Sequence, residues 1–286
     1  MTRIEEKPVI RKNAPSLRRG FAVQALLVAV SLPWVGLAIC AKRADQAIRQ
    51  RHAVEAIRTS GGSAIYDFQM RGGKVLVSPH PPGPDWLRDI VGVDFLARVE
   101  VVTLTAPNDK SLSAIADLGA LRSLALSGEK LKNGDVLSIV SRLKRLRSLW
   151  LYNFTVDEAC WKTLGKINSL ETLNLWGTKL TSAAVGEIKR LPRLKYLVLG
   201  STETTDAQLR QIAEAKSLED VGMIDCSQVT DSGLLELRGL PNLKRVTIWG
   251  KTKITDQGLD RFQKLAPQVK KLSIDRSVDF SKPAPD

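Results

Sequence analysis

Hydrophobic residues recur along most of this chain in the pattern L-x-x-L-x-L, in which Val sometimes replaces Leu. Eight frames of this pattern begin at Val99, Leu121, Leu146, Leu170, Leu194, Leu218, Leu243 and Val269. The steps between them are 22 to 26 residues long, and such a period indicates one supersecondary unit stacked on copies of itself. Because a single unit cannot bury its own apolar face, its neighbours must cover it. Residues 99–275 are therefore predicted to form a solenoid of about eight repeats.

The unit that begins at Leu170 shows how one repeat is predicted to fold. Leu173 and Leu175 alternate with other positions, so their side chains share one face of a short strand. Apolar residues then recur at helical spacing, which predicts a helix that packs on this strand. The sequence thus predicts an α/β fold in which the strands of successive repeats pair in parallel and the helices lie outside the sheet.

Thr-Asp pairs stand directly before three of the predicted helices, at residues 205–206, 230–231 and 255–256. A side-chain oxygen at such a position can accept a hydrogen bond from a backbone N–H of the first helical turn. Negative charge also suits the positive end of the helix dipole. We interpret these threonines and aspartates as helix caps rather than as catalytic groups.

The segments LKYLVL (194–199) and VTDSGL (229–234) resemble leucine-rich repeats. Their T-D-x-G-L form and the repeat length are similar to the cysteine-containing subclass. Cys226 falls where that subclass often has Cys or Asn, and Thr178 and Thr202 occupy the same position in other repeats. The resemblance implies a curved α/β solenoid whose usual role is protein–protein binding. With the apolar segment described next, the plan is similar to membrane-anchored repeat proteins of certain bacteria.

An apolar segment, residues 21–41, carries no charged residue and is flanked by basic residues on both sides. About 20 such residues cross a bilayer core, so we predict a transmembrane or signal-anchor helix behind a basic tail, residues 1–20. A cleaved signal peptide usually has a shorter apolar core. A lipoprotein signal at Cys40 and a twin-arginine export signal are further, less favoured alternatives.

The membrane orientation is poorly determined by charge. Six basic residues precede the apolar segment and five lie in the 20 residues after it, a ratio at which the positive-inside rule barely discriminates. Since long domains translocate largely regardless of charge, we expect a single-pass membrane protein with its repeat domain on the extracytoplasmic side.

Three further segments are predicted: a polar stalk helix, an N-terminal cap and a disordered tail, at residues 42–62, 63–98 and 276–286. In the cap, the runs 64–68 and 74–77 flank two glycines, which is a hairpin signal. A short amphipathic helix follows, and Trp86 at its start is predicted to lie in the core of the cap. Such a cap would cover the apolar face of the first repeat.

The outward side chains of the strands occupy the third, fifth and seventh positions of each frame, and aromatic residues concentrate there on three successive strands. A contiguous exposed aromatic patch is typical of an interaction site, since Trp and Tyr serve as binding anchors. The predicted partner-binding residues are Trp150, Tyr152, Trp176, Tyr196, Asn174, Ser148, Arg245 and Trp249. The alternative is cross-strand packing that only stabilises the sheet.

The net charge of +13 is unevenly distributed, because residues 1–60 hold +7 of it beside the apolar segment. This weakens a nucleic-acid function, which requires a basic stripe on the folded face. Three cysteines, two histidines and no C-x-x-C offer no zinc ligand set. His52 and His80 have no nucleophile near them in the repeat frame, so no catalytic residue, metal site or cofactor is predicted.

The sequence therefore predicts a membrane-anchored scaffold, not an enzyme, that binds a protein or peptide through the aromatic patch of its concave face. A glycan stacked on the rings is a second possible ligand. The alternative function is a structural or spacer component of the cell envelope that has no specific ligand.

Overall fold

The computed structural model describes residues 16–72, 74–128, 134–154, 156, 158–200 and 203–278, with side chains from residue 35 onward except at 134, 135, 159 and 160. The chain divides into two compact units, Met1–Gln46 and Ala47–Asp286. Helix α1 (Ser16–Thr59) begins in the first unit and ends in the second. Most of the predicted basic tail and most of the predicted disordered tail lie outside the described residues.

In the first unit, α1 contains residues 21–41, the predicted membrane segment. From residue 35 to residue 42 the side chains of α1 are exposed, Leu37 and Ile39 among them. Over the part of the chain that the structure describes, no helix combines the length and the apolar character needed to cross a membrane. The membrane anchor therefore stays a prediction.

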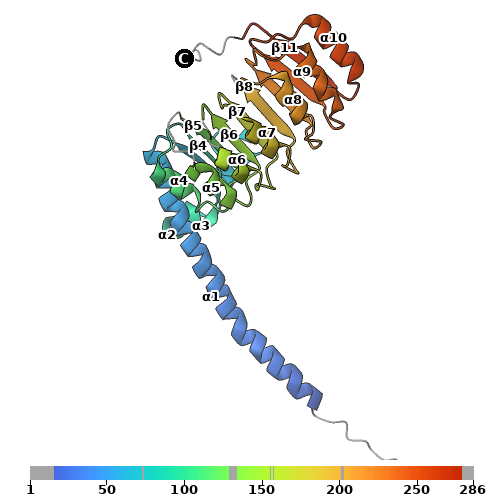
Figure 1. Cartoon of the computed structure of the whole chain (residues 1–286). Coiled ribbons are helices and arrows are strands. Elements are labelled where there is room, and N and C mark those ends of the chain that lie inside the picture. Colours follow the sequence, from blue (N-terminus) through green and yellow to red (C-terminus); the bar gives the residue numbers. More distant parts are fainter. Residues whose placement is uncertain are drawn as a thin grey trace, which may run out of the picture. The chain divides into compact units, whose positions relative to one another are not determined.

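The second unit is organised around a nine-stranded sheet with the order β1-β4-β5-β6-β7-β8-β9-β10-β11. The strands that belong to the repeats are β4 (Val99–Leu104), β5 (Ser123–Ser127), β6 (Ser148–Tyr152), β7 (Thr172–Trp176), β8 (Tyr196–Gly200), β9 (Asp220–Ile224), β10 (Arg245–Trp249) and β11 (Lys271–Asp275). From β4 to β11 every neighbouring pair is parallel. The strands therefore follow one another in chain order along the sheet (Figure 1).

Equivalent positions of successive frames lie side by side in this sheet. Leu149 pairs with Leu173, Leu173 with Leu197, Leu197 with Val221, and Val221 with Val246. All five side chains are at most 1% exposed, so they form a continuous apolar spine through the core. Because a slip of one residue would turn the spine to the other face of the sheet, this pattern fixes the register.

One helix follows each strand from β4 to β10 and lies along one side of the sheet (Figure 1). These helices are α4 (Asp109–Ile115), α5 (Gly134–Arg142), α6 (Glu158–Leu164), α7 (Ser182–Ile188), α8 (Asp206–Ile212), α9 (Asp231–Glu236), which continues into the 3-10 turn η2 (Leu237–Gly239), and α10 (Asp256–Leu265). The predicted α/β solenoid with a parallel sheet is confirmed.

The side chains of Thr230 and Thr255 cap helices, but Asp206 and Asp231 join neighbouring repeats. Thr255 Oγ1 accepts a hydrogen bond from the N–H of Gly258, at 3.0 Å, at the start of its own helix. Asp231, in contrast, accepts hydrogen bonds from the N–H and the hydroxyl of Thr255 in the next repeat, both at 2.7 Å. Asp206 binds Thr230 in the same way, at 2.9 and 2.6 Å. The hydrogen bonds of Asp206 and Asp231 thus run to the next repeat, at Thr230 and Thr255.

The glycine of the T-D-x-G motif makes room for this bridge. A Cβ atom at Gly233 would lie 2.2 Å from Asp206 Oδ1, and one at Gly258 would lie 2.0 Å from Asp231 Oδ1. One repeat earlier, Gln208 stands at the glycine position. The repeat before it has Ser182, not an aspartate, at the position equivalent to Asp206. No bridging carboxylate has to be accommodated there, and Gln208 Nε2 donates instead to the carbonyl of Leu180, at 2.7 Å.

Thr178 and Cys226 occupy equivalent buried positions, as their places in the frame predict. Thr178 Oγ1 donates to the carbonyl of Leu151 at 3.1 Å, and Cys226 Sγ lies 3.7 Å from the carbonyl of Leu199. Each side chain therefore bonds to the strand of the preceding repeat. Thr202 lies outside the described residues, and the assignment to the cysteine-containing subclass stays a prediction.

The cap differs from the predicted hairpin in its partners. Strand β1 (Ser63–Tyr66) pairs antiparallel with β4, while β2 (Met70–Arg71) and β3 (Lys74–Val75) form a separate small hairpin. The first run thus extends the main sheet, where it covers the apolar edge of the first repeat, and the 3-10 turn η1 (Asp67–Gln69) separates it from the hairpin. The predicted amphipathic helix is divided at Gly92 into α2 (Asp85–Val91) and α3 (Val93–Leu96).

The end of α1 belongs to the core and is not a free stalk. Ala53, Val54 and Ile57 are buried among the core residues of the second unit. Gln50 is buried as well: its amide donates to Asp94 and to a backbone carbonyl, and its Oε1 accepts from the N–H of Val99. Every polar atom of this amide is therefore satisfied, which fixes the last turns of α1, within the second unit, on the cap.

Trp86 was expected in the core of the cap, but its side chain is 63% exposed. The expectation is wrong because α2 is only seven residues long and turns Trp86 and Ile90, four residues apart and hence on one face, to the surface.

Candidate functional site

Three predicted residues, Trp150, Tyr152 and Trp176, form one contiguous group on the strand face, which we call the aromatic cluster. Their rings are in contact: the centroids of Trp150 and Tyr152 are 6.0 Å apart, and those of Tyr152 and Trp176 are also 6.0 Å apart, with the second pair edge to face. All three side chains are partly exposed. Aromatic pairs in such geometries stabilise one another by about 0.5–1.5 kcal/mol beyond the area they bury.

The rings of the aromatic cluster are held in place by their neighbours. The indole N–H of Trp150 donates to Ser148 Oγ at 2.7 Å. The indole of Trp176 lies across Gly200 on the next strand, where a Cβ atom would come within 2.1 Å of it. Burial raises the pKa of the Tyr152 hydroxyl, so this group stays protonated at neutral pH. The cluster is therefore a preorganised, uncharged surface.

Asn174 was expected to contact a partner, and the structure contradicts this. Its side chain is only 6% exposed, and its Oδ1 accepts a hydrogen bond from the N–H of Trp176 at 3.0 Å. The residue lies between Trp150 and Val198 on the neighbouring strands. Asn174 is therefore buried and orients the backbone of β7 beneath the aromatic cluster.

The remaining predicted residues lie apart from the cluster. Tyr196 is 40% exposed and stands next to Thr172 on β7, at the other end of that strand from Trp176. Trp249 is 43% exposed and lies on β10, three strands beyond β7. Arg245 forms an ion pair with Asp220 at 3.1 Å. The structure therefore divides the predicted patch into an aromatic cluster with Ser148, and separate residues at Tyr196, Arg245 and Trp249.

Asp220 shows that the second part of the face is electrostatically different. Burial raises the pKa of this carboxyl group, against the opposing effects of Arg245 and Lys271. Gly222, the next outward position of β9, has no side chain, and Val198 of β8 lies close to it. This part of the face thus combines a charged pair with a position that has no side chain, and Trp249 on β10 is a separate ring.

Charges at the second position of the frames are matched between repeats. The ion pairs are Arg122–Glu100 at 2.9 Å, Arg147–Glu171 at 3.2 Å, Lys195–Glu219 at 3.6 Å and Lys244–Glu219 at 2.6 Å. Surface pairs of this kind contribute about 0–1 kcal/mol each, so their main consequence is that these cations already have acidic neighbours.

The described residues contain no group of three or more His, Cys, Asp and Glu side chains able to hold a metal ion. His52 and His80 are both exposed.

Comparisons with known proteins give weak similarities. No family model matches the chain. A curated relative from Caenorhabditis elegans, described as "Putative RNA-binding protein EEED8.10", is 25% identical over 181 residues, or 61% of this chain. The chain spans only 22% of the length of that relative.

Among solved structures, an internalin C2 of Listeria monocytogenes is 15% identical with a TM-score of 0.40, over 78% of this chain and 92% of the internalin. Internalin inlF of the same organism is 18% identical with a TM-score of 0.38, over 59% of this chain and 51% of the other. A TLR13–ssRNA13 complex is 17% identical with a TM-score of 0.38, over 54% of this chain and 21% of the other. At these levels the chain is similar to each protein and is not placed in a family.

Proposed function

We propose that this protein is a repeat scaffold that binds a protein or peptide partner on its strand face, through the aromatic cluster of Trp150, Tyr152 and Trp176. The observation that supports this most is the contact between three partly exposed rings at one place on the sheet. Rings fixed in advance lose little conformational entropy on binding, and such aromatic side chains are the usual anchors of protein interfaces.

A polypeptide fits this surface better than a polynucleotide. Bases can stack on exposed rings, but a nucleic-acid site also needs cations that follow the phosphates. The outward positions of β5 to β8 carry no Lys or Arg, and Arg147 at the edge of β6 is paired with Glu171. The aromatic cluster therefore lacks the cations that a nucleic-acid site needs, whatever the descriptions of the curated relative and of the TLR13 complex say of those proteins.

The apolar segment 21–41 supports a membrane-anchored form with the repeats on the extracytoplasmic side. Protease treatment of intact and permeabilised cells tests this part separately. Digestion of the repeats in intact cells agrees with it, whereas digestion only after permeabilisation contradicts the orientation.

We also infer that the protein acts by binding and not by catalysis. His52 and His80 are both exposed, and neither has a nucleophile near it in the repeat frame. The alternative role is a structural spacer of the cell envelope without a specific ligand.

Partner recovery with matched variants distinguishes a docking scaffold from a spacer. The full chain is purified from cells as the native sequence, as Trp150→Ala/Trp176→Ala, and as Trp249→Ala, and folding is checked by circular dichroism. The proposal predicts that co-purifying partners are lost from the double variant and retained by Trp249→Ala. Partners retained by a folded double variant would contradict the aromatic cluster as the docking site.

A further inference from the structure

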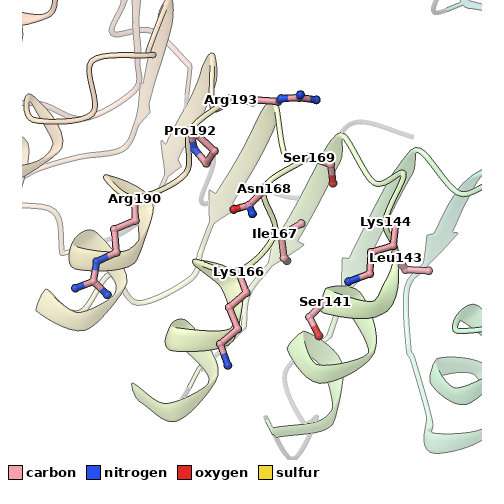
Figure 2. Close-up of a pocket in the computed structure, with 10 residues that line it drawn as sticks. All are labelled: Ser141, Leu143, Lys144, Lys166, Ile167, Asn168, Ser169, Arg190, Pro192 and Arg193. Atoms are coloured by element: carbon pink, nitrogen blue, oxygen red, sulfur yellow. The ribbon is translucent and has the colours of Figure 1, made fainter.

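A hollow opens on the edge of the second unit where α5, α6 and α7 turn toward their next strands (Figure 2). Its volume is about 490 Å³. Four cationic residues from three consecutive repeats line it, Lys144, Lys166, Arg190 and Arg193, and we call it the basic hollow. Its floor contains the buried side chains of Leu143 and Ile167, and it is separate from the aromatic cluster.

The cations of the basic hollow exceed the anions near them. Arg190 pairs with Glu187 at 2.9 Å. For Lys144, Lys166 and Arg193, no carboxylate among the described residues lies within ion-pair distance. With Glu187 included, the hollow therefore carries a net charge of +3. This contrasts with the second position of the frames, where Arg122, Arg147, Lys195 and Lys244 each pair with a glutamate of a neighbouring repeat.

The helix dipoles do not account for all of these cations. A cation is favoured at a helix C-terminus, but the effect falls off within the last turn. Arg193 stands five residues beyond the last residue of α7, Ile188, and Lys144 stands two beyond the end of α5. All four cationic side chains are exposed, and long side chains of this kind can turn toward a bound anion.

Neutral donors complete the lining. The amide of Asn168 and the hydroxyl of Ser169 both line the hollow, between Lys166 and Arg193 in the chain (Figure 2). Phosphate oxygens accept several hydrogen bonds at once, and guanidinium groups bind them bidentately. Each phosphate monoester carries about −1.5 to −2 charges at neutral pH, so two phosphate groups would neutralise the excess of +3.

From this charge, donor set and volume, we propose that the basic hollow is a binding site for a compact ligand that carries two or more phosphate groups. The volume lies in the range of about 300–1,000 Å³ of small-molecule sites, which favours a soluble phosphorylated compound or a lipid headgroup over a polymer. The site is independent of the docking surface proposed above.

Calorimetric titration of the full chain in detergent tests this proposal with two probes. Inorganic triphosphate represents a soluble ligand and inositol 1,4,5-trisphosphate represents a lipid headgroup. The native chain is compared with Lys166→Glu/Arg193→Glu, and with the control Arg261→Glu/Lys264→Glu, which reverses two exposed charges on α10. Thermal melting checks that all three fold.

We expect at least one probe to bind the native chain and the control with similar Kd values, and to bind the hollow variant about tenfold more weakly or worse. The tighter probe then distinguishes a soluble source from a headgroup. No binding of either probe, equal weakening in the control, or equal binding of sulfate would overturn the proposal. A uridine oligonucleotide without terminal phosphates that binds more tightly as its length increases, and that triphosphate does not displace, would overturn it in favour of a polynucleotide.

Discussion

The strand face carries two different surfaces on one backbone. On β6 and β7 the outward positions hold the contacting rings of Trp150, Tyr152 and Trp176 and no charge. On β9 and β10 the equivalent positions include an ion pair of Asp220 with Arg245, a glycine, and Trp249 at the end of β10. The buried leucine positions beneath both are equivalent. Inward positions therefore determine the fold, and outward positions are free to differ between repeats.

The largest expected effect comes from breaking the contact between the repeats of β8 and β9, where the strand face is charged. Gly233→Val places a side chain against Asp206, which bridges to Thr230. We expect a loss of about 1–3 kcal/mol in the free energy of unfolding, measured by chemical denaturation. Adding Asp206→Ala should restore part of the loss. Gly186→Ala, which meets nothing within 4 Å, is the control and should not destabilise. An equal loss in the control would contradict the bridge.

A smaller effect is expected at Gly200, beside the Trp176 indole of the aromatic cluster. Gly200→Ala would push against the Trp176 indole, whereas Gly222→Ala meets Val198 only at 3.3 Å. We expect Gly200→Ala to lower the free energy of unfolding by about 1 kcal/mol and to change the tryptophan fluorescence. Gly222→Ala should do less in both measurements. Unchanged fluorescence in a folded Gly200→Ala variant would show that the indole does not rest on this glycine.

The smallest effect concerns Asp220, which pairs with Arg245. Because burial raises the pKa of Asp220 in the folded state, the folded protein binds this proton more tightly than the unfolded chain does. The group therefore favours folding at low pH, and that contribution is lost as pH rises through the raised pKa. Asp220→Asn should remove this dependence, with little change in stability at pH 7. A strong loss at pH 7 would mean that the ion pair with Arg245 outweighs the cost of burial.

The repeat fold was predictable because period and register depend on the same residues. Leucines spaced at 22 to 26 residues must stack, since nothing else can cover them. The partner of β1 was not predictable, because the glycines at 72–73 favour a local hairpin and the competing pairing with β4 is distant in sequence. The aspartate bridges were missed for the same reason: capping is a local rule, and the acceptor lies 24 residues away from its donor.

The candidate site was predictable in part. Alternation placed Trp150, Tyr152 and Trp176 on one face correctly, but it could not show that Asn174 is buried and bonded to the backbone N–H of Trp176. The basic hollow was missed because its cations occur in helix-to-strand turns, where single basic residues look like solvated charges. Their recurrence in three consecutive repeats was the available signal.

Site-specific photo-crosslinking in cells tests the central claim most directly. A benzophenone amino acid replaces Trp150 in one chain and Trp249 in another, since both positions face outward on the same sheet. The account predicts a defined crosslinked partner from position 150 and none from position 249. Equal crosslinking at both positions, or a partner only at position 249, would contradict the aromatic cluster as the docking surface.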